Sequence, residues 1–293
     1  MSKYANTELI LTPENRVYHL NLKNEDIADN VILVGDQNRV EQISKYFDSI
    51  DFKTAHREFI THTGFFNGKR ITVLSTGIGT DNIDIVMNEL DAAVNINPVK
   101  RELNAKTRSL NVFRLGTSGA LQEYIPVNGL VVSSYGLGLD GLLNFYEGCK
   151  AINEDEISEA FIKHMKWPAH LAYPYCVSAN PMLINEFKES IYFKGITATA
   201  PGFYGPQGRE IRLKTALPDL NNLLNTFSSN NFQIINFEME TSALYGLGKL
   251  LNHNCLTVCV IIANRMRKEF TTNYAESIKI LIENSLNKIS NIK

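Results

Sequence analysis

Short apolar runs alternate with segments of helical periodicity along most of the chain. Residues 31–34 are a continuous apolar run typical of a buried strand, and Val40, Ile43 and Phe47 then recur at helical spacing. The same alternation predicts further strands at 71–74, 111–115, 130–133, 196–200 and 256–263, and further helices near 83–90, 147–168, 181–189, 243–251 and 274–289. This order favours a single α/β domain, residues 1–293, with helices on both faces of a sheet.

A glycine-rich segment follows the predicted strand at 111–115. The sequence Gly-Thr-Ser-Gly at 116–119 is expected to turn sharply, because glycine lets the backbone bend and approach a ligand closely. Arg114, backbone N–H groups and two hydroxyls at the C-terminal end of a strand can hold an oxyanion such as phosphate. The alternative is an ordinary tight turn whose arginine forms a structural ion pair.

A second arginine occupies a comparable position near the start of the chain. The strand at 31–34 runs into Gly35, and Arg39 lies in the first turn of the helix that follows. Backbone donors at a helix N-terminus attract anions, and Arg39 would strengthen that attraction. A solvated arginine is the alternative, although the helix dipole mildly disfavours a cation there.

A β-hairpin is predicted between residues 56 and 75, with its turn at Asn67-Gly68. Its second strand ends in Ser-Thr-Gly-Ile-Gly at 75–79, and Thr80 or Asp81 is expected to cap the next helix. The two glycines suggest a dinucleotide-binding loop, but the third glycine of that pattern would fall at Asn82. The fingerprint therefore fails, and a nicotinamide-dependent dehydrogenase is disfavoured.

Two polar segments in the second half of the chain suggest a small-molecule site. The loop at 201–209 combines Phe203, which can stack, with Gln207 and Arg209, which can hydrogen-bond a planar heterocycle. Glu238 and Glu240 follow a predicted strand and could bind a diol. An incidental Gly/Pro-rich turn and an acidic first helical turn are the respective alternatives.

Composition narrows the class of protein. The net charge of −2 over 293 residues argues against nucleic-acid binding and against a polybasic membrane surface. The first residues show no secretory signal, and the longest apolar run, at 258–263, is too short to span a bilayer. The four cysteines read as buried thiols, and the six scattered histidines form no metal-ligand grouping. A cytoplasmic protein without a metal site is expected.

The chain resembles the nucleoside phosphorylase family, in its type I branch, and the uridine-cleaving members most closely. The resemblance extends over nearly the whole length. It is distributed over short motifs in a common order, at residues 17–20, 35–40, 56–59, 75–79, 114–119, 139–141, 207–209, 237–240 and 264–265. It implies a three-layer α/β/α fold with a central mixed, partly barrel-like sheet.

The resemblance also implies a role for individual residues. The phosphate site would comprise Gly35, Arg39, Arg57, Arg114 and Thr117, with Arg57 contributed by a neighbouring subunit. The ribose site would comprise His19, Glu238, Met239 and Glu240, with His19 reaching across the subunit interface. The base site would comprise Ser118, Gly119, Phe203, Gln207 and Arg209, and Arg265 would belong to a mobile lid. Residues 1–30 would accordingly contribute to a subunit interface. Arg114, Arg209 and Glu240 are the residues expected to act in catalysis.

The reaction that the resemblance implies is cleavage of a pyrimidine nucleoside by phosphate in nucleoside salvage, without an organic cofactor. Nucleoside and phosphate would be the only ligands, and the protein would be a homodimer with shared active sites or a trimer of such dimers. Some bacterial members bind potassium through equivalents of Glu58, Ile78 and a serine. Asn82 replaces that serine here, so a potassium site is doubtful.

Three other activities stay open at this point. A purine nucleoside phosphorylase would carry an aspartate after the last core strand, where this chain has Ala263-Asn264. A nucleosidase, which uses water, has no need of three arginines at the phosphate site. A non-catalytic nucleoside-binding module would not need Glu240 beside a complete phosphate site.

Overall fold

The computed structural model describes residues 4–292, so residues 1–3 of the predicted interface segment lie outside the described residues. The central sheet comprises β1 (Asn30–Val34), β2 (Ser49–His56), β3 (Phe59–Phe66), β4 (Lys69–Ser75), β7 (Asn111–Ala120), β8 (Leu130–Gly138), β9 (Tyr175–Ser178), β10 (Tyr192–Thr199), β11 (Ser228–Ser229), β12 (Phe232–Glu238), β13 (Asn254–Asn264) and β14 (Glu269–Phe270). The helices are α1 (Gln37–Ser44), α2 (Thr80–Asn95), α3 (Cys149–Ile152), α4 (Asp155–Met165), α5 (Pro181–Asn185), α6 (Leu220–Thr226), α7 (Thr241–Leu250) and α8 (Ala275–Asn291). Three short 3-10 turns lie at Asn24–Asp26, Leu142–Phe145 and Gly205–Gln207, and a separate small ribbon pairs β5 (Ile96–Asn97) with β6 (Glu102–Leu103).

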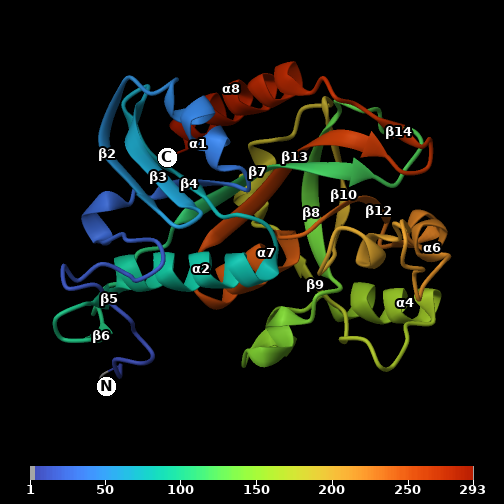
Figure 1. Cartoon of the computed structure of the whole chain (residues 1–293), viewed down its shortest axis with the longest axis horizontal. Coiled ribbons are helices and arrows are strands. Elements are labelled where there is room, and N and C mark those ends of the chain that lie inside the picture. The colour runs from blue at the N-terminus through green and yellow to red at the C-terminus, as the bar shows by residue number, and fades with distance from the viewer. Residues whose placement is uncertain (1–3, 293) are drawn as a thin grey trace.

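The sheet is mixed and partly closed on itself (Figure 1). Its strands pair in the order β11-β12-β10-β8-β13-β7-β1-β4-β3-β2, and β12 also pairs with β7 in antiparallel fashion. Strands β7, β13, β8, β10 and β12 therefore form a closed ring, from which β1, β4, β3 and β2 extend as an open wing. The predicted mixed, partly barrel-like sheet is confirmed.

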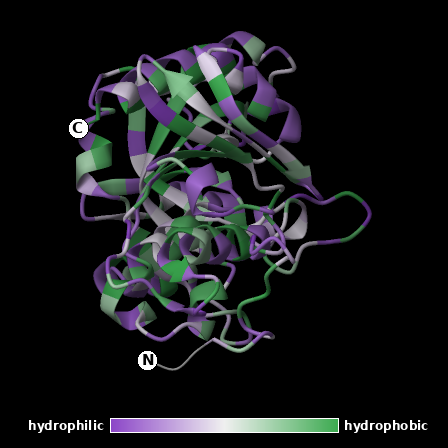
Figure 2. Ribbon diagram, turned by 90° about the vertical axis from the view of Figure 1, so that its left-hand side faces the viewer, coloured by the Kyte–Doolittle hydropathy of each residue, from purple (hydrophilic) through white to green (hydrophobic). Residues whose placement is uncertain are grey.

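Helices cover both faces of this sheet, as the alternating pattern predicts. Helix α7 packs on β8, β13 and α2, whereas α1 packs on β3 and β4, and α8 packs on β13. In Figure 1 α1 and α8 lie on one side of the sheet and α2 and α7 on the other. Figure 2 shows apolar segments gathered in the strands and the helices packed on them. Every residue of β1 is buried, as expected of a strand covered on both faces.

Residues 116–119 do not form the predicted turn. Strand β7 continues through them to Ala120, because β13 pairs with it over its whole length and β12 pairs with it at Gly119. Gly116 is instead required by the packing of its neighbours, because a larger residue would not fit there. A Cβ there would lie 2.2 Å from Nη1 of Arg114 and 3.1 Å from Sγ of Cys259.

Several predicted boundaries are also wrong. Residue Arg57 has a φ of 56° and belongs to a turn between β2 and β3, so the hairpin strand starts at Phe59, and β2 itself was not predicted. Helix α2 is capped by Gly79, without a side-chain hydrogen bond, and not by Thr80 or Asp81. The helix expected at 147–168 divides into α3 and α4, and the one expected at 181–189 ends at Asn185. The Asn67-Gly68 hairpin turn is present as predicted.

Candidate active site

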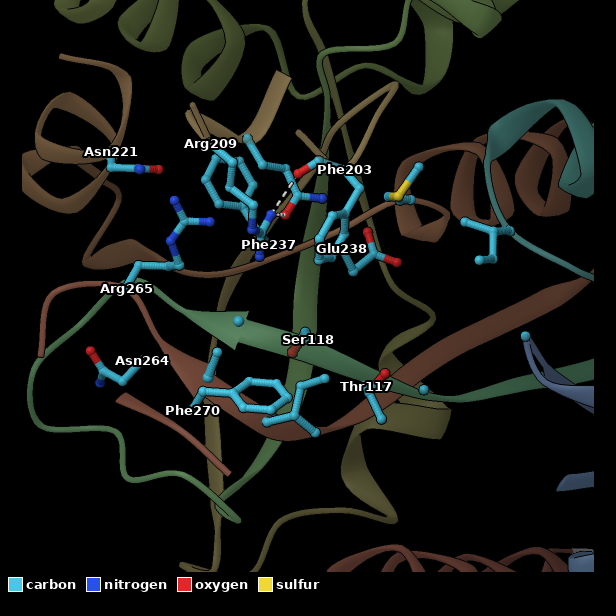
Figure 3. A pocket seen from close by; sticks show the side chains of 18 of the residues that line it. Thr117, Ser118, Phe203, Arg209, Asn221, Phe237, Glu238, Asn264, Arg265 and Phe270 are labelled. Carbon is cyan, nitrogen blue, oxygen red and sulfur yellow. Dashed lines mark hydrogen bonds between the residues drawn. The ribbon is translucent and has the colours of Figure 1, made fainter. Parts of the chain in front are cut away.

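A cavity of about 980 Å³ opens where β7, β12 and β13 end, beside the loop at 201–209 (Figure 3). All but two of the residues predicted for the site line it: Gly35, Arg39, Arg114, Thr117, Ser118, Gly119, Phe203, Gln207, Arg209, Glu238, Met239, Glu240 and Arg265. These residues come from five separate segments of the chain, at 35–39, 114–119, 203–209, 238–240 and 265. The fold therefore brings together the residues that the sequence scattered over more than 200 positions.

One end of the cavity contains a buried ion-pair cluster. Arg114 projects from β7 and forms ion pairs with Glu240 and, at 3.5 Å from Nη1 to Oε2, with Glu238. All three side chains are almost fully buried. Burial raises the pKa of Glu240, although the Arg114 guanidinium and the N–H of Gly79, 2.9 Å from Oε1, favour the charged form. The two acids keep Arg114 charged and oriented.

The two acids occupy the junction between β12 and α7. Glu238 is the last residue of β12, and Glu240 precedes the first residue of α7. The Glu238 carboxylate accepts hydrogen bonds from the backbone N–H groups of Glu240 and Thr241, at 3.0 and 2.9 Å. These are donors that a helix N-terminus otherwise leaves without partners, so the acids also stabilise the start of α7.

Arg39 lies on the same side of the cavity as Arg114. Its side chain turns inward from α1, is 8% exposed, and donates to the carbonyl of Leu115 over 3.3 Å. Burial lowers the pKa of Arg39, Asp36 opposes that shift, and the neighbouring Arg114 adds to it. Within residues 4–292 Arg39 forms no ion pair with a carboxylate, so an anion beside it would relieve an unfavourable burial of charge.

The other end of the cavity contains a polar group suited to a flat ring. Arg209 donates from Nη1 to the side-chain oxygen of Gln207 and to the carbonyl of Phe203, both over 2.6 Å, and its guanidinium lies 3.8 Å from the centre of the Phe203 ring. Burial, together with the charge of Arg265, lowers the pKa of Arg209 to about 10. Within residues 4–292 neither Arg209 nor Arg265 forms an ion pair with an acid, which makes this end attractive to a group that develops negative charge.

Residues of β7 form the wall between the two ends. The hydroxyl of Ser118 accepts a hydrogen bond of 2.9 Å from the amide of Asn236, which fixes its position, and Thr117 precedes it on the same strand. Gly119 lies against the aliphatic part of Arg265, 3.8 Å from the position that a Cβ would take. Gly35 likewise lets the start of α1 approach the carbonyl of Gly77.

His19 and Arg57 do not line this cavity. His19 is held by Glu89, with 2.6 Å between Nδ1 and Oε1, and Arg57 donates to the hydroxyl of Tyr18 over 3.3 Å. Tyr18 packs edge-on against the His19 ring and lies under the Arg57 guanidinium. The two predicted site residues are therefore joined through Tyr18 in one surface cluster, which we call the Tyr18 cluster (Tyr18, His19, Arg57).

The cavity also has lining residues that the sequence did not reveal. Among them are Asn221 on α6 and Phe270 on β14. Neither belongs to a recognisable local pattern, because each reaches the cavity only through the tertiary fold. Among residues 4–292, no group of three or more His, Cys, Asp or Glu side chains is arranged to hold a metal ion. Within the same range, no helix is long and apolar enough to cross a bilayer.

Comparison with known proteins agrees with this geometry. The model of the phosphorylase superfamily matches residues 29–287. The uridine phosphorylase of Thermococcus kodakarensis is 30% identical to this chain, and the match covers 97% of this chain and 93% of the relative. The uridine phosphorylase of Haemophilus influenzae is also 30% identical, and that match covers 86% of this chain and 88% of the relative. A purine nucleoside phosphorylase of Buchnera aphidicola is 26% identical over 87% of this chain and 90% of its own.

A solved structure is similar over the same range. The Trypanosoma brucei nucleoside phosphorylase, described as showing uridine phosphorylase activity, superposes with a TM-score of 0.87 at 28% identity, covering 97% of this chain and all of its own. The predicted family and fold are thereby confirmed. The chain belongs to the phosphorylase superfamily and is a pentosyltransferase of the nucleoside phosphorylase type, most similar to the uridine phosphorylases.

Proposed function

We propose that this enzyme cleaves uridine with inorganic phosphate, giving uracil and ribose 1-phosphate, in nucleoside salvage within the cytoplasm. The observation behind the choice of a pyrimidine is the Gln207–Arg209 pair at the end of the cavity opposite Arg39 and Arg114. Arg209 orients the Gln207 amide, whose nitrogen can donate to one base carbonyl while its oxygen accepts from the ring N–H. Arg209 itself can donate to the second carbonyl.

Phosphate binding is assigned to the opposite end. Arg39, Arg114, the backbone N–H of Gly35 and the hydroxyl of Thr117 would hold the dianion beside the anomeric carbon. Arg39 lacks an acidic partner among the described residues, which makes it the stronger attractor of the two arginines. Holding the nucleophile in one orientation supplies much of the rate enhancement.

The sugar would lie between these ends. Glu240 would accept from its hydroxyls, with Met239 and Glu238 beside it, while phosphate attacks the anomeric carbon. A bond forms from a phosphate oxygen to that carbon as the bond to the base nitrogen breaks, through an oxocarbenium-like state. The electron pair leaves with the base, where Arg209 and Arg265 stabilise the developing anion, and solvent then protonates the base. The proposal requires no organic cofactor, and the doubtful potassium site has no part in it.

The Tyr18 cluster is assigned to a neighbouring subunit's site. His19 and Arg57 lie together but away from the cavity of their own chain. Arg57 would complete the phosphate site of a second copy, and His19 would meet the 5′-hydroxyl of its sugar. The enzyme would then be a homodimer or a trimer of dimers.

The residue at 264 offers no acid for a leaving purine. Asn264, which stands where purine enzymes of this family carry the aspartate, donates to the carbonyls of Gln122 and Ile125 over 2.9 and 2.8 Å. Its side-chain oxygen accepts from the backbone of Met266 and Arg267. This amide is committed to the protein on every side and cannot protonate a leaving purine.

One experiment separates the candidate activities. The enzyme is incubated with uridine, thymidine, inosine or methylthioadenosine, with and without phosphate, and the free base is measured. We expect release of uracil only when phosphate is present. Preference for inosine over uridine would indicate a purine enzyme, release without phosphate would indicate a nucleosidase, and binding without release would indicate a non-catalytic module.

A further inference from the structure

Glu238 has an unusual number of donors for a carboxylate that faces a ligand cavity. Oε1 accepts from the hydroxyl of Thr199 at 2.7 Å and from the N–H of Thr241 at 3.1 Å. Oε2 accepts from the N–H groups of Glu240 and Thr241, and Arg114 lies 3.5 Å away. Both oxygens are thus committed to the protein, and the Glu238 side chain is only 2% exposed. Its orientation fixes the backbone of Glu240 and one side of Arg114.

Thr199 supplies the one hydroxyl in this set. It is the last residue of β10, where it pairs with Glu238 of β12, and its side chain is fully buried. Its hydroxyl donates to Glu238 and accepts from the backbone N–H of Ser242, which is 3.0 Å away. A hydroxyl has a single hydrogen. Because the Ser242 N–H is a donor and the Glu238 carboxylate is an acceptor, that hydrogen must point at Glu238.

The N–H of Ser242 is itself held in place. The side-chain hydroxyl of Ser242 donates to Asp140 over 2.8 Å, and Asp140 also accepts from the hydroxyl of Tyr175 and from the backbone N–H of Leu142. None of the residues of this network lines the cavity of about 980 Å³. Thr199 therefore joins a rigid part of the fold to the acid that orients Glu240.

We propose that Thr199 is a positioning residue for the reaction. It acts through Glu238, by holding that carboxylate in the one orientation that bonds the Glu240 backbone and faces Arg114. Loss of the hydroxyl frees Glu238 to turn toward Arg114, which displaces Glu240 from the sugar and draws Arg114 away from phosphate. The assignment of the sugar and phosphate ends rests on the proposed function above, but the role of Thr199 applies to any nucleoside that this enzyme cleaves.

A purely structural role is the competing explanation, because a buried hydroxyl that satisfies a helix N–H also contributes to stability. Thr199→Val removes the hydroxyl and keeps the shape, whereas Thr199→Ser keeps the hydroxyl. Thr63→Val is the matched control, since Thr63 is equally buried on β3 and its hydroxyl donates to the carbonyl of Asp26, far from the cavity.

The test measures kcat, KM for nucleoside and KM for phosphate, with the parent enzyme first assayed on uridine, thymidine and inosine. On the best substrate we expect Thr199→Val to lose about 10- to 100-fold in kcat/KM, mostly in kcat, which is the range for one hydrogen bond to a charged group. Thr199→Ser should stay within about threefold of the parent, and Thr63→Val should lower the melting temperature without this kinetic loss. If the proposed function is wrong, the parent enzyme will prefer a substrate other than uridine. If the role of Thr199 is wrong, the kcat/KM values of the Thr199 variants relative to the parent will differ from those expected.

A double-mutant cycle tests whether Thr199 acts through Glu238. In a Glu238→Gln enzyme, adding Thr199→Val should cause little further loss, because the carboxylate that it orients is already gone. If Thr199→Val does not fold, Thr199→Ala takes its place in both comparisons. The proposal is overturned by full additivity, by parental kinetics in Thr199→Val, or by a Thr199→Ser enzyme as slow as Thr199→Val.

Discussion

Arg39 and Arg114 differ in what their removal leaves behind. Replacing Arg114 by Ala leaves Glu238 and Glu240 buried without a counter-charge, so both turnover and stability should fall, the latter by about 3–5 kcal/mol. Replacing Arg39 by Ala removes a cation that has no ion pair within residues 4–292. Its kcat/KM for phosphate should fall by about 100-fold or more with little change in stability.

These effects are measured by varying phosphate at saturating nucleoside and by thermal unfolding of each variant. Parental turnover in Arg114→Ala, or an unchanged kcat/KM for phosphate in Arg39→Ala, would remove these arginines from the phosphate site. A larger loss of stability in Arg114→Ala than in Arg39→Ala would confirm the ion pairs of Arg114 independently of the kinetic results.

The protonation of Glu240 should determine the acid limb of the pH profile. Burial raises the pKa of this acid, and the charge of Glu238 adds to the shift. The required form is the charged one, so kcat/KM should fall as pH decreases, and the fall should begin at a higher pH than for an ordinary glutamate. Glu238→Gln removes a neighbouring negative charge and should move this limb to lower pH. A limb common to both enzymes would instead report the ionisation of phosphate.

Single residues were predictable from the sequence where they belong to a motif. Arg39, Arg114 and Gln207 each lie within four residues of a glycine in short ordered segments, and all three line the cavity. Thr199 and Asn221 gave no such signal. A threonine at the end of a strand or an asparagine on a helix becomes informative only when the fold shows which group it meets.

At the scale of elements, β7 shows how a correct motif can suggest a wrong shape. Two glycines within four residues are typical of a turn, but here they lie in a strand paired on both sides. The sequence could not indicate that Gly116 makes room for the Arg114 guanidinium and for Cys259. The missed strand β2 has the opposite cause, since most of its residues are exposed and its polar pattern resembles a surface segment.

Gly116→Ala tests this packing requirement. The added methyl would lie 2.2 Å from Nη1 of Arg114, so the guanidinium must move away from its two acids. We expect kcat/KM to fall by about tenfold or more, in keeping with the sensitivity of catalysis to small displacements. Gly205→Ala is the control for the loss of a glycine, because nothing lies within 4 Å of a Cβ there. Equal activity in the two variants would show that Arg114 tolerates the shift.

At the scale of the whole molecule, the proposed site needs two chains. If Arg57 of one subunit completes the phosphate site of the other, then Arg57→Ala and Arg114→Ala enzymes should each be nearly inactive. Mixed dimers of the two variants contain one site with both arginines intact. Co-expression should therefore restore about a quarter of the parental activity, since half the dimers are mixed and each has one complete site. No recovery in isolated mixed dimers would show that Arg57 serves its own chain or none.

The overall architecture was predictable because it rests on repeated local patterns. Buried strands such as β1 and amphipathic helices such as α2 and α8 follow from periodicity alone. The closure of the sheet does not, because the pairing of β12 with β7 joins residues more than 100 positions apart. That closure is also what sets Glu238 beside Arg114, so the site depends on the least predictable feature of the fold.

The ion-pair cluster has a consequence for assembly. When ionised, Arg39, Arg114, Glu238 and Glu240 together carry no net charge, so within one chain the attraction for an incoming dianion depends on the local charge of Arg39. In the proposed dimer, the partner's Arg57 supplies the excess positive charge. Thermodynamic linkage then requires that phosphate strengthen subunit association by the same factor by which association strengthens phosphate binding. Inorganic phosphate would thus be a mass-action regulator of the oligomer as well as a substrate, and depletion of phosphate would favour the free subunits.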